Sequence, residues 1–359
     1  LLLSFNLKLR ALASILQRVV YMEKLNLEIQ RRDYYVGSIV LYVDENLDEG
    51  IRYPATFFTL DDRKKVERIL EGSRRIQCNN LLQPLTVGVQ QTDGWILAFH
   101  RMIHQSFVEW ADRQTWITDF IAEHIDRSLF QLVERVHGYG FRIGRSLESP
   151  WCYGMISDSI FLIDLEGSIC PLSDGDKKED EKKEDVRYLG RFLQEKIVPM
   201  IENQHCLSLR DFVELTYLPS IEFSDLKNHP FCLETNKVSW FYYSMSKWYQ
   251  TSTALRLNFE KNVKKRSRGM RWRHFPDWTR IVGNYALLNA IYQHRPERCQ
   301  GGGAGKLLLL ARNGLAHFRD YEAKWEQRDP QRISTEVNAI YPNFMAVCYS
   351  ERLKEELKS

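Results

Sequence analysis

The sequence predicts an α+β fold in which a strand-rich first part is followed by a mainly helical remainder. Short runs rich in Val, Ile and aromatic residues cluster before residue 100, and helix-period patterns dominate after residue 105. The chain has 359 residues, more than one hydrophobic core usually organises, which favours two domains. Hydrophobic residues make up 44% and charged residues 27%, a balance typical of globular proteins.

The N-terminal stretch, residues 1–20, is predicted to form an amphipathic helix. Its apolar residues recur at helical spacing, with Lys8, Arg10 and Arg18 between them, unlike the continuous apolar core of a signal peptide. The sequence lacks an initial Met, which we interpret as the mark of a fragment. No apolar run reaches the ~18 residues that a membrane span needs, so we expect no membrane segment in this chain.

Residues 34–138 are predicted to contain both strands and helices. Residues 34–43 and 52–60 favour strands, because they are rich in β-branched and aromatic residues. Residues 61–72 begin with two acids and end in Gly, which predicts a helix with a C-terminal glycine cap. Residues 81–100 predict a hairpin with Asp-Gly in its turn at positions 93–94. A long helical zone is expected over 105–138.

Four later stretches have distinctive compositions. Residues 159–174 predict two short strands around Glu166-Gly167, and the charged run 174–185 predicts a solvated loop, since it has no apolar anchor. The aromatic stripe 240–250 has helical spacing and predicts packing in the core or at an interface, not a binding box. The glycine-rich stretch 300–307 lacks the outer residues of a phosphate-binding loop and indicates a turn before a helix.

Charge and cysteine usage narrow the classes of function. The net charge is only +3, so affinity for nucleic acid must come from a local patch. The seven cysteines show no metal-ligand spacing, and reduced thiols in a cytoplasmic protein are the simplest interpretation.

The order of the elements is similar to that of a protein kinase, and two motifs strengthen the likeness. "DVRYLGRFL" (185–193) resembles the start of the large-lobe helix that follows the activation segment of kinases. "DLKNHPFC" (225–232) resembles the motif that closes the kinase large lobe in one family.

Three further motifs follow in the order of that same family. "PDWTRIVGNYALLNAI", "ARNGLAHFRDY" and "IYPNFMAVCYS" resemble the helices of the kinase-extension nuclease (KEN) domain. This is the family of the unfolded-protein-response sensor kinase-ribonuclease and of RNase L. The resemblance implies a bilobal protein-kinase-like domain over 34–232, an all-α KEN ribonuclease domain over 233–359, and an N-terminal helix or linker over 1–33.

The kinase-like part lacks most of the residues that phosphate transfer needs. There is no glycine-rich loop, Phe57 occupies the lysine position, and Glu67 or Glu71 therefore has no lysine to pair with. Only Asp174 matches the metal-binding aspartate. The aspartate slot of the catalytic loop and the metal-binding asparagine slot fall near Arg145 and on Asp158, Ser159 or Ile160. We therefore predict a pseudokinase scaffold and leave binding of ATP or ADP open.

The candidate ribonuclease residues lie in one short stretch. Asn313 and His317 are four residues apart and share a helix face, and Arg312 precedes them. His317 suits a general acid, because imidazole titrates near neutrality, and Arg312 suits a phosphate binder. The resemblance implies these roles, with Asn313 as a second phosphate binder.

The family tyrosine that serves as general base is displaced in this chain. An ungapped count back from Arg312 places Cys299 in its slot, and a shift would bring Tyr292 or His294 there instead. A basic run upstream could follow an RNA backbone, with a Trp ring stacked on a base. Its candidate contacts are Arg266, Arg268, Arg271 and Trp272.

The resemblance implies a metal-independent endoribonuclease that leaves a 2′,3′-cyclic phosphate and needs no cofactor. It also implies RNA as the partner and a homodimer formed through the kinase-like and KEN domains. Two alternatives stay open: a catalytically inactive interaction protein, and an ATP-binding serine/threonine kinase.

Overall fold

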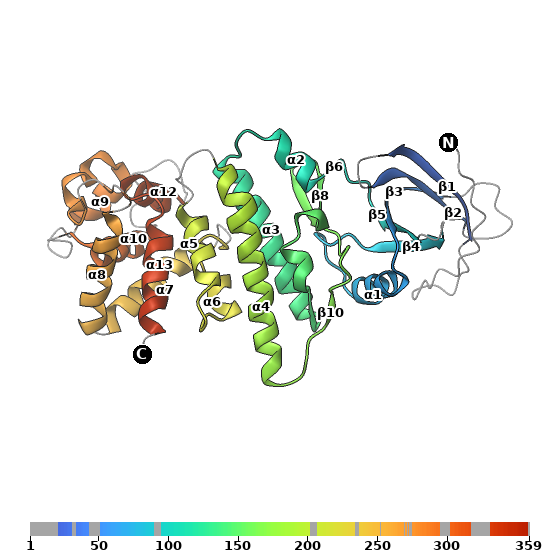
Figure 1. Ribbon diagram of the computed structural model, residues 1–359. Coiled ribbons are helices and arrows are strands. Elements are labelled where there is room, and N and C mark those ends of the chain that lie inside the picture. The colour runs from blue at the N-terminus through green and yellow to red at the C-terminus, as the bar shows by residue number, and fades with distance from the viewer. Residues whose placement is uncertain are drawn as a thin grey trace. The chain divides into compact units, whose positions relative to one another are not determined.

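The structure is a computed structural model that describes most of the chain. The chain divides into two compact units, unit 1 (Leu1–Glu202) and unit 2 (Asn203–Ser359), and the described residues mix helix with strand, as the α+β prediction requires (Figure 1). The described residues are 21–30, 34–42, 51–89, 95–201, 207–233, 237–251, 253–268, 270, 272, 275–294, 302–316 and 331–357.

Unit 1 begins with a five-stranded antiparallel sheet in the order β1-β2-β3-β5-β4 (Figure 1). The predicted strands and hairpin are confirmed, while the hairpin turn at 93–94 lies outside the described residues. The strands are β1 (Tyr21–Gln30), β2 (Tyr35–Tyr42), β3 (Ile51–Leu60), β4 (Pro84–Val89) and β5 (Trp95–His100).

Strand β1 corrects the expectation of a helix or linker over 1–33 for its residues 21–30, while residues 31–33 lie outside the described residues. It pairs antiparallel with β2 from Tyr21↔Tyr42 to Gln30↔Tyr35. Its Leu25, Leu27 and Ile29 alternate with polar residues, a period-2 pattern that favours a strand. The predicted helix over 1–20 lies outside the described residues.

Helix α1 (Arg63–Arg74) starts where its acids predicted but ends later. The Asp62 carboxylate accepts a hydrogen bond from the Lys64 amide at 2.8 Å, which caps the first turn. Gly72 lies inside the helix and is not its cap. A Cβ there would collide with the Ile169 carbonyl oxygen, so glycine is needed for close packing.

The remainder of unit 1 is mainly helical and includes two small sheets. The zone predicted over 105–138 forms two helices, each with a side-chain cap at its start, Ser106 and Thr118. The elements are β6 (Gln105–Ser106), α2 (Phe107–Arg113), α3 (Asp119–Gly138), β7 (Phe141–Arg142), η1 (Gly144–Leu147), η2 (Pro150–Cys152), β8 (Tyr153–Ile156), β9 (Ser159–Leu162), β10 (Cys170–Pro171), α4 (Asp176–Phe192), η3 (Leu193–Ile197) and η4 (Val198–Met200).

The charged run 174–185 was wrongly predicted as a loop, because most of it forms the first half of α4. Asp176 and Glu179 lie in the first turn, where carboxylates favour the helix dipole, and Lys182 pairs with Glu179 at 2.7 Å. The apolar anchors are in the second half, where Val186 and Leu189 are buried. Tertiary packing of the second half of α4 therefore stabilises the helix, and the charged first half extends from it.

The two strands predicted around Glu166-Gly167 do not pair with each other. Strand β9 pairs with β8, and β10 pairs with β7. The intervening turn closes on a side chain instead, because the Asp164 carboxylate accepts hydrogen bonds from the amides of Ser168 and Ile169.

The described residues of unit 2 form helices joined by turns and loops, with no named strand among them. Part of the aromatic stripe is core, since Phe241, Tyr242 and Met245 of α7 are buried, whereas Trp240 and Tyr243 are exposed. The helices are α5 (Leu207–Thr216), α6 (Phe223–Lys227), α7 (Val238–Thr251), α8 (Thr253–Ser267), η6 (Trp278–Arg280), η7 (Val282–Asn284), α9 (Ala286–His294), α10 (Ala304–Ala316), α12 (Gln331–Ile340) and α13 (Phe344–Glu356).

In the sequence, the boundary between the two compact units falls about thirty residues before the domain boundary expected at 232/233. Helices α5 and α6 cluster with the helices that follow, because both are bonded to α13. The Tyr349 hydroxyl donates to the Asp225 carbonyl at 2.7 Å, and the Ser350 hydroxyl donates to the Asp211 carboxylate. No described helix combines the length and apolar character of a membrane span.

Candidate functional site

The Arg-Asn pair of the predicted nuclease site lies near the end of α10. The Arg312 guanidinium donates a hydrogen bond to the Asn313 side-chain oxygen at 2.6 Å, and both residues are partly accessible. The pair therefore keeps four guanidinium N–H groups and the amide NH2 available for a ligand. His317 directly follows the last residue of α10, and it lies outside the described residues, as do Cys299 and Arg271.

Helix α10 is packed on several sides by other helices of unit 2. A Cβ at Gly314 would collide with Ile291 of α9 and press on Ile333 of α12, and a Cβ at Gly305 would collide with the Tyr249 ring of α7. Glycine is therefore needed at both positions for close packing. The contact between Ile291 and Gly314 brings α9 alongside the segment that carries Asn313.

One stripe of α10 stays accessible. Lys306, Leu309, Asn313 and Ala316 are not buried, and their spacings of three, four and three residues place them on one helix face. The residues between them are mostly buried. We call these four residues the α10 stripe.

The two candidate bases lie on α9 and differ in their surroundings. The Tyr292 ring packs edge-on against Trp278 with centroids 5.8 Å apart. Trp278 in turn donates its indole N–H to the Gly303 carbonyl at 3.0 Å, beside the first residue of α10. Nine residues of helix separate Gly303 from Arg312, a rise of ~13 Å. His294, by contrast, is exposed and ends α9 three residues beyond Ile291.

The basic run contributes fewer RNA contacts than the sequence suggested. Arg266 forms ion pairs with the carboxylates of Asp211, Glu214 and Glu351, and Asp211 is fully buried. This network joins α8 to α5 and α13. The assignment of Arg266 to RNA binding is therefore corrected to a structural role, whereas exposed Arg268 remains a candidate.

Trp272 is also corrected, from a base-stacking residue to a core residue. It is only 8% exposed, stacks on Tyr341 at 4.9 Å and donates its indole N–H to the Pro342 carbonyl at 3.1 Å. Its apolar surface is already covered, which leaves no free face for a base.

The start of α10 is closed by a carboxylate, which agrees with a turn rather than a phosphate-binding loop. Glu260 of α8 accepts hydrogen bonds from the amides of Ala304 and Gly305 at 3.0 and 2.8 Å. Gly302 and Gly303 form the turn with positive φ angles of 65° and 90°. The amides that a phosphate would need are thus occupied.

The kinase-like positions of unit 1 carry no phosphate-transfer machinery among the described residues. Phe57 is fully buried on β3. The carboxylates of Glu67 and Glu71 are exposed and pair with arginines on their own helix, Arg63 and Arg75. Asp174 is exposed in a bend before α4 and does not follow a core strand directly, unlike Asp164.

Sequence reasoning missed Asp164, a buried carboxylate that follows β9 almost directly. It accepts hydrogen bonds from the hydroxyl of Ser146 at 2.6 Å and from the amides of Ser168 and Ile169 at 3.0 and 3.1 Å. Burial raises the pKa of Asp164, and these hydrogen bonds oppose the rise. The apolar run before it, "SIFLI", was the available signal, since a carboxylate after a buried strand often lies in a site.

Asp185 holds the loop that follows β7. Its two oxygens accept hydrogen bonds from the amides of Ile143 and Gly144, both at 2.8 Å, and it contacts the His137 ring at 3.0 Å. Asp185 is the first residue of the "DVRYLG" motif, and this bonding explains why an acid is needed there.

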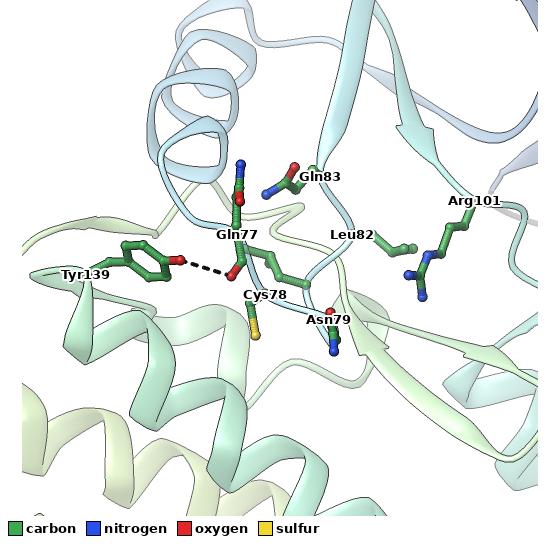
Figure 2. A pocket seen from close by; sticks show the side chains of 8 residues that line it. Gln77, Cys78, Asn79, Leu82, Gln83, Arg101 and Tyr139 are labelled. Atoms are coloured by element: carbon green, nitrogen blue, oxygen red, sulfur yellow. Dashed lines mark hydrogen bonds between the residues drawn. The ribbon is translucent and has the colours of Figure 1, made fainter. Parts of the chain in front are cut away.

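Unit 1 also contains a polar pocket of about 380 Å³ (Figure 2). The loop between α1 and β4, Arg101 after β5 and Tyr139 at the end of α3 line it, and the Tyr139 hydroxyl donates to the Gln77 carbonyl at 3.3 Å (Figure 2). Gln77, Asn79 and Gln83 supply amide groups. The pocket could hold a small polar ligand, but neither Asp164 nor Phe57 lines it.

Among the described residues, no group of three or more His, Cys, Asp or Glu side chains could hold a metal ion. Comparison with models of known protein families gave no match, and comparison with curated protein sequences gave none either.

Proposed function

We propose that this protein is an endoribonuclease of the KEN type, built on a pseudokinase scaffold and active as a homodimer. The observation that carries the proposal is the Arg312–Asn313 pair, hydrogen-bonded and partly accessible on α10, with His317 four residues after Asn313 in the sequence. A guanidinium and an amide can bind the phosphate and an imidazole can act as the acid, so metal-free cleavage of a phosphodiester needs only a base in addition.

The proposed reaction is an internal transfer at one phosphate. A base removes the proton of the ribose 2′-hydroxyl, and the 2′-oxygen bonds to phosphorus. Arg312 and Asn313 stabilise the charge that builds on the phosphate oxygens. The bond from phosphorus to the 5′-oxygen breaks, and His317 gives that oxygen a proton. The products are a 2′,3′-cyclic phosphate and a 5′-hydroxyl.

His294 is the better supported of the two candidate bases. It is exposed and ends α9 within one turn of the contact between Ile291 and Gly314. The Tyr292 ring is instead packed on Trp278. We therefore assign the base to His294 and keep Tyr292 as the second choice.

The kinase-like part acts as a scaffold in this proposal, in a bilobal arrangement like that of a protein kinase. The residues present do not fit magnesium-ATP as a substrate, because Phe57 cannot neutralise a phosphate and the oxygens of Asp164 are taken by hydrogen bonds from the chain. No reaction step is assigned to a nucleotide.

The test is cleavage of an end-labelled stem-loop RNA by the wild-type chain and by His317→Ala. We expect the wild type to cleave, and His317→Ala to lose at least ~100-fold in rate, because loss of a general acid costs 10²–10⁴-fold. Lys265→Gln serves as the control, since Lys265 is exposed on α8. Equal rates for wild type and His317→Ala would overturn the assignment.

A non-catalytic interaction protein is the second candidate. The packing of the Tyr292 ring on Trp278 favours an inactive protein, because this packing does not direct the Tyr292 hydroxyl toward Arg312. A wild-type dimer that cleaves no RNA at any protein concentration would support this candidate and exclude the first.

A further inference from the structure

A second pocket, of about 380 Å³, lies in unit 2 at the start of α10. Three lysines line it: Lys261 and Lys264 from consecutive turns of α8, and Lys306 from the first turn of α10. The Gly302–Gly303 turn and Pro276 form another part of the wall.

The pocket is positively charged, although it contains one carboxylate. Glu260 is bound by the Tyr249 hydroxyl at 3.0 Å as well as by two backbone amides. Three lysines and a single glutamate line the pocket, so cationic side chains outnumber carboxylates in its lining. Among the described acidic side chains, none forms an ion pair with Lys261 or Lys264.

The pocket and the candidate cleavage site share one face of α10. Lys306 belongs to the pocket and to the α10 stripe, which also carries Asn313. Seven residues separate Lys306 from Asn313, close to two helical turns, so both lie on one face with a rise of ~10 Å between them. A strand that lies along this face can meet both ends.

We propose that the pocket formed by Lys261, Lys264 and Lys306 binds a backbone phosphate of the RNA strand whose reacting phosphate meets Arg312 and Asn313. This rests on the proposed function for the choice of RNA as the ligand. Ammonium groups attract phosphate without reading the base, so the pocket fixes the position of the strand and not its sequence.

The test measures binding separately from cleavage. The probe is a fluorescein-labelled stem-loop of 2′-O-methyl RNA, which cannot be cut because it lacks the attacking hydroxyl. Its affinity is measured by anisotropy across a salt series for wild type, Lys261→Gln, Lys264→Gln and Lys306→Gln. Lys265→Gln is the matched control, because Lys265 is equally exposed on the same helix and does not line the pocket.

Each pocket variant should lower the salt slope by part of the ~0.7 that one bound phosphate contributes, and so shrink the loss of affinity between ~50 and ~200 mM salt by up to about threefold. Lys265→Gln should leave the slope as in wild type. Equal effects of Lys264→Gln and Lys265→Gln would overturn the proposal, and so would a wild type that binds no probe. Binding that obeys the prediction in a protein that cleaves no RNA would reject the proposed function and keep the pocket.

Discussion

Asp164 of unit 1, which likeness to kinases did not single out, and the Arg312–Asn313 pair of unit 2, which likeness to a nuclease did, are held in opposite ways. In unit 1, Asp164 is buried and accepts hydrogen bonds from Ser146, Ser168 and Ile169. In unit 2, Arg312 and Asn313 bond to each other and stay accessible.

The difference shows where chemistry can still take place. A buried carboxylate that the chain satisfies, such as Asp164, has few lone pairs left for a metal or a substrate. A polar pair on an accessible helix face keeps its remaining donors for a ligand. We therefore assign the proposed activity to unit 2 and propose that unit 1 is its scaffold.

The largest effect is expected at Arg266 of unit 2, whose side chain, like that of Asp164 in unit 1, is held by bonds within the chain. Arg266→Ala should lower the free energy of unfolding by ~3–5 kcal/mol, because it leaves buried Asp211 without its guanidinium partner and Glu351 with Lys354 alone. Urea unfolding of the full chain measures this. Arg268→Ala is the control and should change stability by less than ~0.5 kcal/mol. A stable Arg266→Ala protein with weakened RNA binding would restore Arg266 as an RNA contact.

A smaller effect is expected at Asp164. Asp164→Asn should cost roughly 2–3 kcal/mol, because the new NH2 group faces amide and hydroxyl donors that have lost an acceptor. Thermal unfolding measures the loss, and magnesium-ATP should not raise the midpoint of the wild type. A magnesium-dependent rise in the wild type that Asp164→Asn abolishes would make Asp164 a metal ligand after all.

Asp126 of α3, also in unit 1, differs from Asp164 because it is buried without hydrogen-bond partners. Neither carboxylate oxygen has a hydrogen-bond partner among the described residues, and burial raises the pKa of Asp126 well above its ordinary value. A raised pKa in the folded state means that this group favours folding fully below its unfolded pKa of about 3.9, and that the benefit is lost as pH rises through the folded pKa.

Asp126→Leu should therefore stabilise the protein by about 1–2 kcal/mol at neutral pH and give little gain near pH 4. Urea unfolding at a series of pH values measures the difference between variant and wild type. A gain that is constant across the series would show that the carboxyl does not titrate with folding.

Local patterns predicted the elements that are set by local chemistry. The strands at 34–43 and 52–60 and the capped start of α1 follow from side-chain type and an N-cap acid. The first half of α4 could not be predicted this way, because its helix depends on the packing of Val186 and Leu189 downstream.

The site was predictable only where residues adjoin in the sequence. Arg312 and Asn313 are neighbours, so their pairing follows from the helix. The burial of Arg266 depends on Asp211, fifty-five residues earlier, and on Glu351, eighty-five residues later, which no local pattern joins. The lysine pocket was missed for the same reason, because Lys306 and Lys264 meet only through the packing of α8 and α10.

The most direct test of metal-independent RNA cleavage at Arg312 and Asn313 is the rate of cleavage of a labelled stem-loop RNA in the presence of a metal chelator, for wild type and Asn313→Ala. We expect that the wild type cleaves and leaves a 2′,3′-cyclic phosphate. Asn313→Ala should be slower by ~10²–10³-fold with unchanged unfolding. A wild type that cleaves nothing, or an Asn313→Ala variant that cleaves at the wild-type rate, would contradict it.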